Sequence, residues 1–447
     1  MTRHLTGHTS GPRTLHPPDK STSAPAPGVR RRELIIALLG GAVASACSSS
    51  SETPSNEPGE ALDVSRFGAN GDGREDETAA IQRALDDARS SGAVVTFVRG
   101  RVYRAMGLDS TGCRIDLNGA TLRVPDSEVA HPIITAKGAT AVSGGTLDGN
   151  AGGSFPRPDP DLSCGISIDS EDGWSGLVHL AGLTIVNTHG HGIRAATGNW
   201  ITDSEATPAS DLTIEDVAIT GGSSGILLHR IRNPVVRDCT VKECSESGVR
   251  LFLTFGAHLS ENTTTDCGQH GFTVLYSSRT MLEKNSAVGC ALSGIAVGGG
   301  SADLAPGTHY RVVENVCTSN SDSGITCDPT VRGLSGHPIP VYGVVADNSC
   351  GDNGIHGIVL TCAAHMNVRS NDCTSNRNSG IALATAHTKV SRNTCEGNSR
   401  YGIAIYGNPS RPRYGWHEVI NNHLAGNDVA NINIESAVIP GVNVSGD

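Results

Sequence analysis

Aromatic and charged residues are both scarce in this 447-residue sequence. Phe, Trp and Tyr make up 4% of it, and Asp, Glu, Lys and Arg make up 18%. A chain with so few rings must build its interior from thin layers of Val, Ile, Leu, Ala and Cys side chains. The 45 Asp and Glu outnumber the 34 Lys and Arg, for a formal net charge of −11. Nucleic-acid binding requires a basic face, so we expect no nucleic-acid partner.

Long hydrophobic runs are also absent, since no apolar stretch reaches the roughly 18 residues of a membrane-spanning helix. A shorter one, residues 34–46, follows three arginines and ends in small residues, which is the pattern of a secretory signal. At the start of this stretch, Arg31-Arg32-Glu33-Leu34-Ile35 resembles a bacterial twin-arginine export signal.

The end of this stretch, Ala44-Ser45-Ala46-Cys47, resembles a lipoprotein box, in which the cysteine is lipidated and becomes the mature N-terminus. We predict an export and lipoprotein signal over residues 1–47, a Ser- and Pro-rich tether over residues 48–61, and a membrane anchor through the lipid on Cys47. An ordinary signal with an incidental Cys47 is the alternative. The predicted location is the surface or exterior of a bacterium. Without its first 46 residues, which carry six Lys or Arg and two Asp or Glu, the chain has a formal charge of −15.

A short motif repeats along most of the chain. A small or polar residue, a glycine and then an aliphatic residue or Phe recur at Gly192, Gly225, Gly248, Gly271, Gly294, Gly324, Gly357, Gly380 and Gly402. These glycines are most often 23 residues apart, so one structural unit is stacked many times. A unit of this length is too short for a strand and a crossover helix, but it suits three short strands and three turns. We predict an all-β fold, a right-handed parallel β-helix of about ten coils over residues 62–447.

Identical side chains keep a constant distance from the repeated glycine. Nine residues before it lie Asn262, Asn285, Asn315, Asn348, Asn371 and Asn393, and cysteines recur four or seven residues before it. In adjacent coils such residues would stack about 4.8 Å apart. We expect the cysteines to form columns of buried free thiols, because a twin-arginine substrate folds in a reducing cytosol. No paired C-x-x-C spacing indicates a metal site.

The start of the domain predicts a capping helix. Residues 78–89 place five apolar side chains on one helical face, Ala80, Ile81, Ala84, Leu85 and Ala88. Asp76 precedes them as a plausible N-cap. Such a helix would cover the strand edges that the first coil otherwise exposes.

The same segment resembles the N-terminal module of the pectate-lyase-like superfamily. The resemblance rests on Phe67-Gly68-Ala69-Asn70-Gly71-Asp72-Gly73, Thr78-Ala79-Ala80-Ile81-Gln82 and Val94-Val95-Thr96-Phe97, and with the repeats it covers residues 62–436. Polygalacturonases, alginate C5-epimerases, rhamnogalacturonan-degrading enzymes and phage tailspikes share this module. The resemblance implies a polysaccharide partner, bound in a groove along the helix axis.

Functional side chains gather on the strand that follows each repeated glycine. If the first residue after the glycine points inward, the second and fourth point outward. In these outward positions the early coils carry Arg194, His229 and Arg250, and Arg230 and Tyr276 lie just beyond the same strands. Arginine clamps carboxylates, and His, Tyr or Arg can abstract the C5 proton of a uronate. We predict Arg194, His229, Arg250 and Tyr276 as catalytic residues; a solvated face with scattered polar residues is the alternative.

Four further residues are predicted to bind substrate: Arg230, His270, His191 and Asp328. His191 lies in Gly190-His191-Gly192, which matches the Gly-His-Gly of polygalacturonases, but their Asn-Thr-Asp and Asp-Asp carboxylates have no counterpart nearby. Asp328 begins Asp328-Pro329-Thr330-Val331, which keeps only the first half of the Asp-Pro-His-Glu of alginate epimerases.

Ca²⁺ is the one cofactor that the sequence suggests. Its candidate ligands are Asp148, Asp169, Glu171 and Asp172, with turn capping by these residues as the alternative.

The predicted function is that of an anchored, exported enzyme, of lyase or C5-epimerase type, that acts on a uronic-acid-containing polysaccharide. A polygalacturonase-like glycoside hydrolase is one alternative, but it would need two carboxylates about 5–10 Å apart, which the outward positions do not clearly supply. A non-catalytic glycan-binding surface protein is the other. We expect a monomer.

Overall fold

The computed structural model describes residues 60–126, 128–174, 176–198, 211–298, 308–327, 341–406, 416–435 and 443–445. The predicted export signal, the lipidation site Cys47 and nearly all of the tether lie outside these residues. Within the described ranges, no helix is long and apolar enough to cross a membrane.

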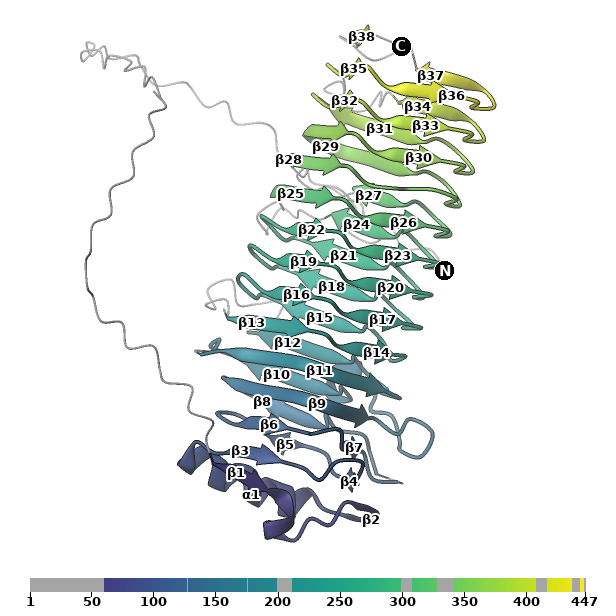
Figure 1. The fold of residues 1–447 in the computed structure, drawn as a ribbon. Coiled ribbons are helices and arrows are strands. Elements are labelled where there is room, and N and C mark those ends of the chain that lie inside the picture. Colours follow the sequence, from purple (N-terminus) through teal and green to yellow (C-terminus); the bar gives the residue numbers. More distant parts are fainter. Residues whose placement is uncertain are drawn as a thin grey trace, which may run out of the picture. The chain divides into compact units, whose positions relative to one another are not determined.

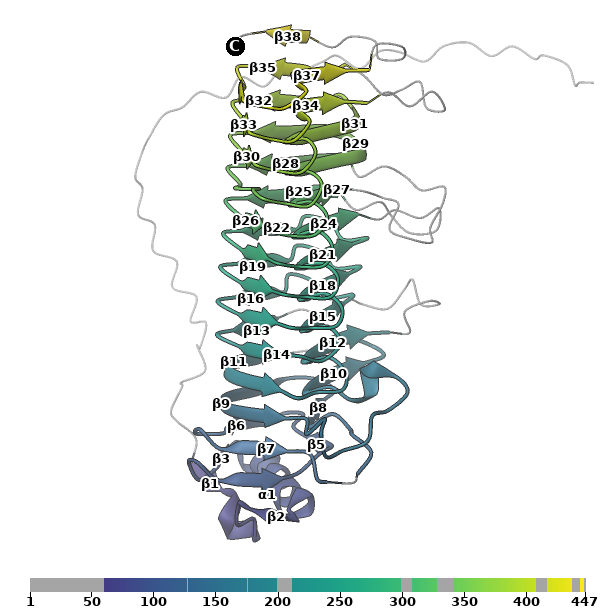
Figure 2. The ribbon, with the colours of Figure 1, turned by 90° about the vertical axis from the view of Figure 1, so that its right-hand side faces the viewer.

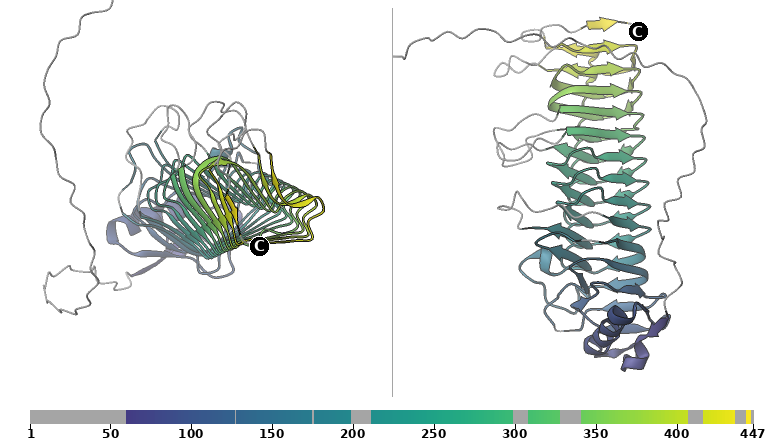
Figure 3. Two further views of the ribbon diagram at one scale, coloured as in Figure 1. Left: turned by 90° about the horizontal axis from the view of Figure 1, so that it is seen from above. Right: turned by 90° about the vertical axis from the view of Figure 1, so that its left-hand side faces the viewer.

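A cap precedes the coils. It consists of β1 (Ala61–Asp63), η1 (Val64–Phe67), β2 (Asp72–Asp76) and α1 (Thr78–Ser91). The inward face of α1 is the predicted one: Ile81, Ala84, Leu85 and Ala88 are buried. Asp76 accepts a hydrogen bond from the Thr78 N–H at 2.8 Å, so it caps the first turn, although Glu77 is the N-cap residue by position. The helix lies across one end of the stack of coils, as predicted (Figures 1 and 3).

Beyond the cap, the chain winds into coils whose strands form three lanes (Figures 1 and 2). Neighbouring strands within a lane pair in parallel. The first lane follows the repeated glycines and contains β5 (Leu108–Asp109), β8 (Ile134–Ala136), β10 (Ile166–Ser170), β12 (Ile193–Thr197), β15 (Ile226–His229), β18 (Val249–Phe252), β21 (Phe272–Leu275), β24 (Ile295–Gly298), β27 (Ile325–Cys327), the first half of β29 (Ile358–Arg369), β31 (Ile381–Ala386), β34 (Tyr401–Ile405) and β37 (Ala430–Ile434).

The other two lanes complete each coil. The second lane contains β3 (Val94–Thr96), β6 (Arg114–Asp116), the first halves of β9 (Thr140–Asp148) and β11 (Val178–Val186), β13 (Leu212–Glu215), β16 (Val235–Arg237), β19 (His258–Ser260), β22 (Met281–Glu283), β25 (Thr308–Val313), β28 (Val341–Ala346), the second half of β29, β32 (Lys389–Ser391), β35 (Glu418–Ile420) and β38 (Asn443–Ser445). The third lane contains β4 (Val102–Arg104), β7 (Thr121–Arg123), the second halves of β9 and β11, β14 (Ala218–Thr220), β17 (Thr240–Lys242), β20 (Thr263–Thr265), β23 (Ser286–Val288), β26 (Val316–Thr318), β30 (Asp372–Thr374), β33 (Thr394–Glu396) and β36 (His423–Ala425).

The repeated glycines lie where successive coils approach closely. A Cβ atom on Gly225 would lie 2.2 Å from a methyl carbon of Val241 and 2.7 Å from the carbonyl oxygen of Gly248. Both distances are too short for real atoms, so a side chain at this position would force the coils apart. The next residues alternate as predicted, because Ile226 and Leu228 are fully buried whereas Leu227 is partly exposed.

The polar and thiol ladders also form as predicted. The Asn285 side-chain amide donates to Asn315 Oδ1 at 3.0 Å, and the same oxygen accepts the Asn285 backbone N–H at 2.9 Å. The same pair of bonds joins Asn315 to Asn348 and continues up the stack. Eleven cysteines are buried, and none of these eleven is in a disulfide. These columns replace the aromatic core that the composition excludes, and they align the coils so that outward residues lie above one another.

Candidate functional site

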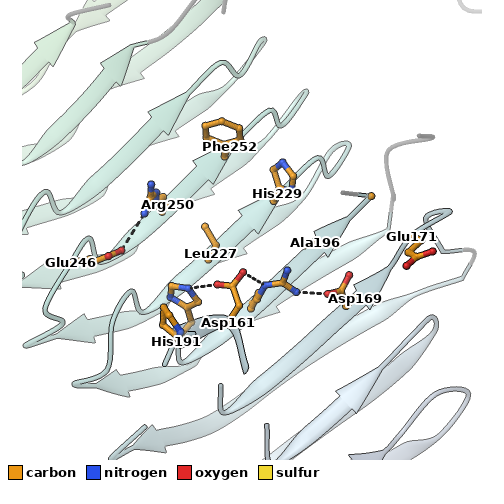
Figure 4. A pocket seen from close by; sticks show the side chains of 13 residues that line it. Asp161, Asp169, Glu171, His191, Ala196, Leu227, His229, Glu246, Arg250 and Phe252 are labelled. Carbon is orange, nitrogen blue, oxygen red and sulfur yellow. Dashed lines mark hydrogen bonds and ion pairs between the residues drawn. The ribbon is translucent and has the colours of Figure 1, made fainter. Parts of the chain in front are cut away.

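A pocket of about 400 Å³ opens on the outer face of the first lane. Its floor is formed by β10, β12, β15 and β18, and one wall comes from the loop that contains η2 (Pro160–Leu162) (Figure 4). The polar residues that line it are Asp161, Asp169, Glu171, His191, Arg194, His229, Glu246 and Arg250. Leu227, Ala196 and Phe252 supply apolar patches.

Strand register brings three of the four predicted catalytic residues into this pocket. Arg194 pairs with Leu227, and Leu227 with Arg250, so the two arginines lie two coils apart in one outward column. His229 lies in the neighbouring column beside Phe252. Tyr276 does not line the pocket; its ring packs edge-on against Phe252, with centroids 5.1 Å apart.

Asp161 is the centre of a charged network. Its Oδ1 lies 3.0 Å from His191 Nε2, and its Oδ2 lies 3.0 Å from Arg194 Nε. Arg194 Nη1 contacts Asp169 at 2.7 Å on its other side. The hydrogen bond from His191, followed by the positive charge of Arg194, lowers the pKa of Asp161 to about 2. Asp161 is therefore ionised, and its carboxylate forms an ion pair with the Arg194 guanidinium.

The tautomer of His191 follows from its two partners. The Ser224 backbone N–H donates to His191 Nδ1 at 3.1 Å, so that nitrogen carries the lone pair. The proton must then lie on Nε2, where His191 donates it to Asp161. His191 is thus a neutral imidazole that orients a carboxylate in the pocket.

His229 is the candidate proton acceptor. Its side chain is 7% exposed, and its ring packs against Phe252 with centroids 5.4 Å apart. Burial, together with the positive charges of Arg230 and Arg194, lowers the pKa of His229 to about 4. At neutral pH this imidazole is uncharged and has a lone pair for a proton.

Arg250 is the more accessible arginine of the pocket. Its side chain is 32% exposed, against 15% for Arg194. Its ion pair is with Glu246, at 3.1 Å, whose carboxylate also accepts a hydrogen bond from the Ser224 hydroxyl. A ligand carboxylate would therefore compete with one protein carboxylate at Arg250 but with two at Arg194.

The predicted substrate-binding residues divide into three groups. His191 lines the pocket. Arg230 and His270 do not: Arg230 is 9% exposed and influences the site through the pKa of His229, and His270 accepts the Ser293 N–H at a coil corner. Asp328 lies outside the described residues.

Four carboxylates line the pocket from positions other than the outward ones that follow the repeated glycines. Asp161 lies in an insertion between coils, Asp169 and Glu171 lie at and after the end of β10, and Glu246 lies in the turn before β18. None of them is the second or fourth residue after a repeated glycine. The outward positions of the repeat therefore did not identify them as candidate catalytic groups. The spacing of Glu246 and Arg250, four residues apart, is the one signal that could have paired them.

The described residues contain no group of three His, Cys, Asp or Glu side chains placed to hold a metal ion. Asp169, a predicted Ca²⁺ ligand, is instead paired with Arg194. Asp148 accepts the Asn150 N–H at 2.9 Å and so caps a turn, the alternative that the sequence left open. The donor set thus does not fit a calcium site.

Comparison with known proteins agrees with this architecture. Residues 164–334 match the family described as "Right handed beta helix region", and residues 304–437 match "Periplasmic copper-binding protein (NosD)". No curated protein sequence matches the chain. The A-module of mannuronan C-5 epimerase AlgE4 from Azotobacter vinelandii superposes with a TM-score of 0.63 at 20% identity, covering 86% of this chain and 100% of that module.

The chain has the fold of a right-handed parallel β-helix. Two other members of this fold superpose on it. The catalytic unit of a GH87 α-1,3-glucanase from Streptomyces thermodiastaticus has a TM-score of 0.59 at 15% identity and covers 86% of this chain and 69% of its own. The periplasmic alginate epimerase AlgG has a TM-score of 0.50 at 14% identity and covers 79% and 77%. At such identities the likeness establishes the fold, which carries several chemistries.

The copper-binding description of the second family finds no matching donor set in this β-helix protein. Where residues 304–437 are described, they offer no cluster of three metal-ligating side chains. His365 and His387 are neighbours, but their rings stack face to face, 5.0 Å apart and 3° from parallel. A metal ion binds imidazole nitrogen in the ring plane, so one ion cannot lie in both planes.

Proposed function

We propose that this β-helix protein is an exported polysaccharide-active enzyme that acts on a uronic-acid-containing polysaccharide by proton abstraction, as a lyase or C5-epimerase. The observation that carries the proposal is a neutral, buried His229 in the same pocket as two arginines. The alginate epimerases with the same fold are consistent with such a substrate.

In this proposal, Arg250 releases its ion pair with Glu246 and binds the C6 carboxylate of one sugar instead. Neutralising that carboxylate makes the C5 proton more acidic, and His229 accepts the proton. In elimination, the C5–H electrons form a C4–C5 double bond as the C4–O bond breaks, and the leaving oxygen takes up a proton from water. In epimerisation, water supplies a proton to C5 from the opposite face. Asp161, held by His191 and Arg194, orients the sugar through hydrogen bonds.

The pocket carboxylates support glycoside hydrolysis as a second candidate. Hydrolysis by two carboxyl groups needs one ionised member, as base or nucleophile, and one protonated member, as acid. Asp161 suits the ionised role because its pKa is about 2. Glu171 and Glu246, which line the same pocket, are the candidates for the protonated role. A neutral glycan would suit this reaction better, because two arginines face four acidic residues.

One set of assays separates these reactions. The full chain is incubated with polymannuronate, polygalacturonate and neutral glucans in D₂O. Ultraviolet absorbance of an unsaturated uronate indicates elimination, deuterium at C5 without chain cleavage indicates epimerisation, and reducing ends without absorbance indicate hydrolysis. No product from any polymer would contradict the enzyme and favour a glycan-binding surface protein.

Two variants assign the chemistry to the pocket. His229→Gln should abolish elimination or epimerisation, because glutamine cannot accept the proton. If His229→Gln keeps full activity while Asp161→Asn abolishes it, the carboxylate mechanism is the correct one. His423→Gln is the matched control, since this exposed histidine lies on β36 in the third lane.

Export and anchoring are part of the proposal. The names of the second matching family and of AlgG both contain "periplasmic", which agrees with the signal in residues 1–47. Cys47→Ser should release the protein from the membrane fraction of expressing bacteria and prevent incorporation of labelled palmitate. A wild-type protein that is already soluble after export would contradict the anchor. Light scattering of the chain without residues 1–47 should give the mass of a monomer.

A further inference from the structure

Five exposed rings stack in one column at the corner between the first and second lanes. They are His309, Tyr342, His365, His387 and Trp416, and we call them the ring column. Neighbouring ring centroids are 5.5, 5.1, 5.0 and 5.2 Å apart, and the planes of neighbouring rings lie within 23° of each other. The rings come from β25, β28 and β29 and from the residues just before β32 and β35, which follow one another up the second lane (Figure 1).

The backbone beneath the ring column is left-handed at every step. The φ angles run from 48° at His387 to 67° at Tyr342. Two lower coils have Asn233 and Gly256 at the same corner, with φ of 49° and 70°. Gly, Asn, Asp and His are the residues most often found in this conformation, whereas Tyr and Trp are not. The turn itself is therefore compatible with the three histidines, but it does not account for Tyr342 and Trp416 or for a ring in each of five successive coils.

The rings of the ring column lie on the surface of the protein. Tyr342 and Trp416 are each 50% exposed, and the three histidines are exposed as well. Within the described part of the chain, the imidazoles of His309, His365 and His387 make no hydrogen bond to another residue. Because the rings cover one another's faces, they present their edges outward. The result is a row of N–H, N and O–H groups, spaced by about 5 Å along the axis.

The ring column continues from the pocket. His229, Phe252 and Tyr276 form a shorter stack at the ends of β15, β18 and β21, with centroids 5.4 and 5.1 Å apart. Arg279 lies three residues after Tyr276 and two residues before Met281. Because Met281 pairs with Arg311, which lies two residues after His309, Arg279 occupies the same corner one coil below His309. One turn of chain thus connects the rings beside the pocket with the foot of the ring column.

We propose that the ring column is a second binding surface for the polysaccharide, which holds an extended chain parallel to the helix axis by hydrogen bonds from its ring edges. A regular polymer is the ligand that suits a regular row of donors and acceptors. The step of about 5 Å is close to the length of one pyranose unit, so successive sugars meet successive coils. The column is not a platform for stacking sugars, since its ring faces are covered. The inference rests on the proposed function only for the class of ligand.

The test is binding without turnover. The full chain and a His365→Gly/His387→Gly double variant are run through native gels that contain polymannuronate, polygalacturonate or a neutral β-1,4-glucan. Glycine is chosen because Gly256 already occupies this corner, so the left-handed turn is kept while the polar ring edge is removed. We expect the double variant to bind about tenfold more weakly to the polymer that retards the wild type, the effect of losing two hydrogen bonds. His423→Gly, on another lane, should bind as the wild type does.

Kinetics provide the second measurement. If the pocket is active, the double variant should raise KM for the polymer and leave kcat/KM for a short oligosaccharide unchanged, because a short substrate cannot span both surfaces. Equal retardation of wild type and double variant, or no retardation by any polymer, would overturn the inference. The protein could also show no turnover and yet be retarded by a polymer in a way that depends on the ring column. This result would contradict the proposed enzymatic activity but support the second binding surface, so the two proposals can fail separately.

Discussion

The protonation of His229 gives a prediction that the structure makes quantitative. Burial and two neighbouring arginines lower the pKa of its imidazole from 6.5 to about 4. At about 1.4 kcal/mol per pKa unit, the difference corresponds to about 3 kcal/mol against charging this side chain in the folded protein. The unfolded chain binds a proton near pH 6.5, whereas the folded chain does so near pH 4. His229 should therefore cost the fold up to about 3 kcal/mol as the pH falls through this window, with no further loss below it.

Two assays check this reasoning. The ring protons of His229, followed by NMR during a pH titration, should move with a midpoint well below 6.5. If His229 is the base, the acid limb of kcat/KM should fall at the same low pH. His417→Gln is the matched control: burial also lowers the pKa of His417 to about 4, so its loss should change acid stability without moving the acid limb. An NMR midpoint near 6.5 for His229 would refute the argument that it is neutral because it is buried.

Three further predictions concern the pocket and the coils. Asp161→Asn should reduce activity at least tenfold, because asparagine cannot pair with Arg194 as a charge, and activity within twofold of wild type in a kinetic assay would contradict this role. Gly225→Ala should lower the free energy of unfolding by about 1–3 kcal/mol, because the new methyl group would overlap Val241. Gly152→Ala, which meets nothing within 4 Å, should leave denaturant midpoints unchanged. Asn348→Ala should destabilise by about 2–4 kcal/mol in the same assay, because it leaves buried partners of the ladder without hydrogen bonds.

The fold was predictable because its constraints are local and repeated. Gly225 must lack a side chain for a reason that recurs in each coil, and Asn285 bonds to the residue at its own position one coil later. A repeat of this kind reports contacts between neighbours in space as a period in the sequence. Arg194, His229 and Arg250 could be placed together by the same logic, since register aligns residues at equal distances from the glycine.

The other pocket residues do not follow the repeat, so the sequence does not predict their positions. Asp161 reaches the pocket from an insertion whose path no repeat predicts, and only its contacts with His191 and Arg194 reveal its charge state. The ring column was missed for a related reason. Three of its five residues, His309, Tyr342 and Trp416, follow insertions of different lengths, so the alignment of all five is visible only in the strand register.

The sequence by itself thus determined the coil, the direction of each side chain and the small, thiol-rich interior, since each depends on a residue and its own repeat. Only the tertiary structure decided which charges meet, because ion pairs and pKa values depend on distances between atoms that are far apart in the chain. The sequence and the tertiary structure together explain the scarcity and the placement of the aromatic residues. The narrow core has little room for rings, and five of the few rings and imidazoles stand outside it in one exposed column.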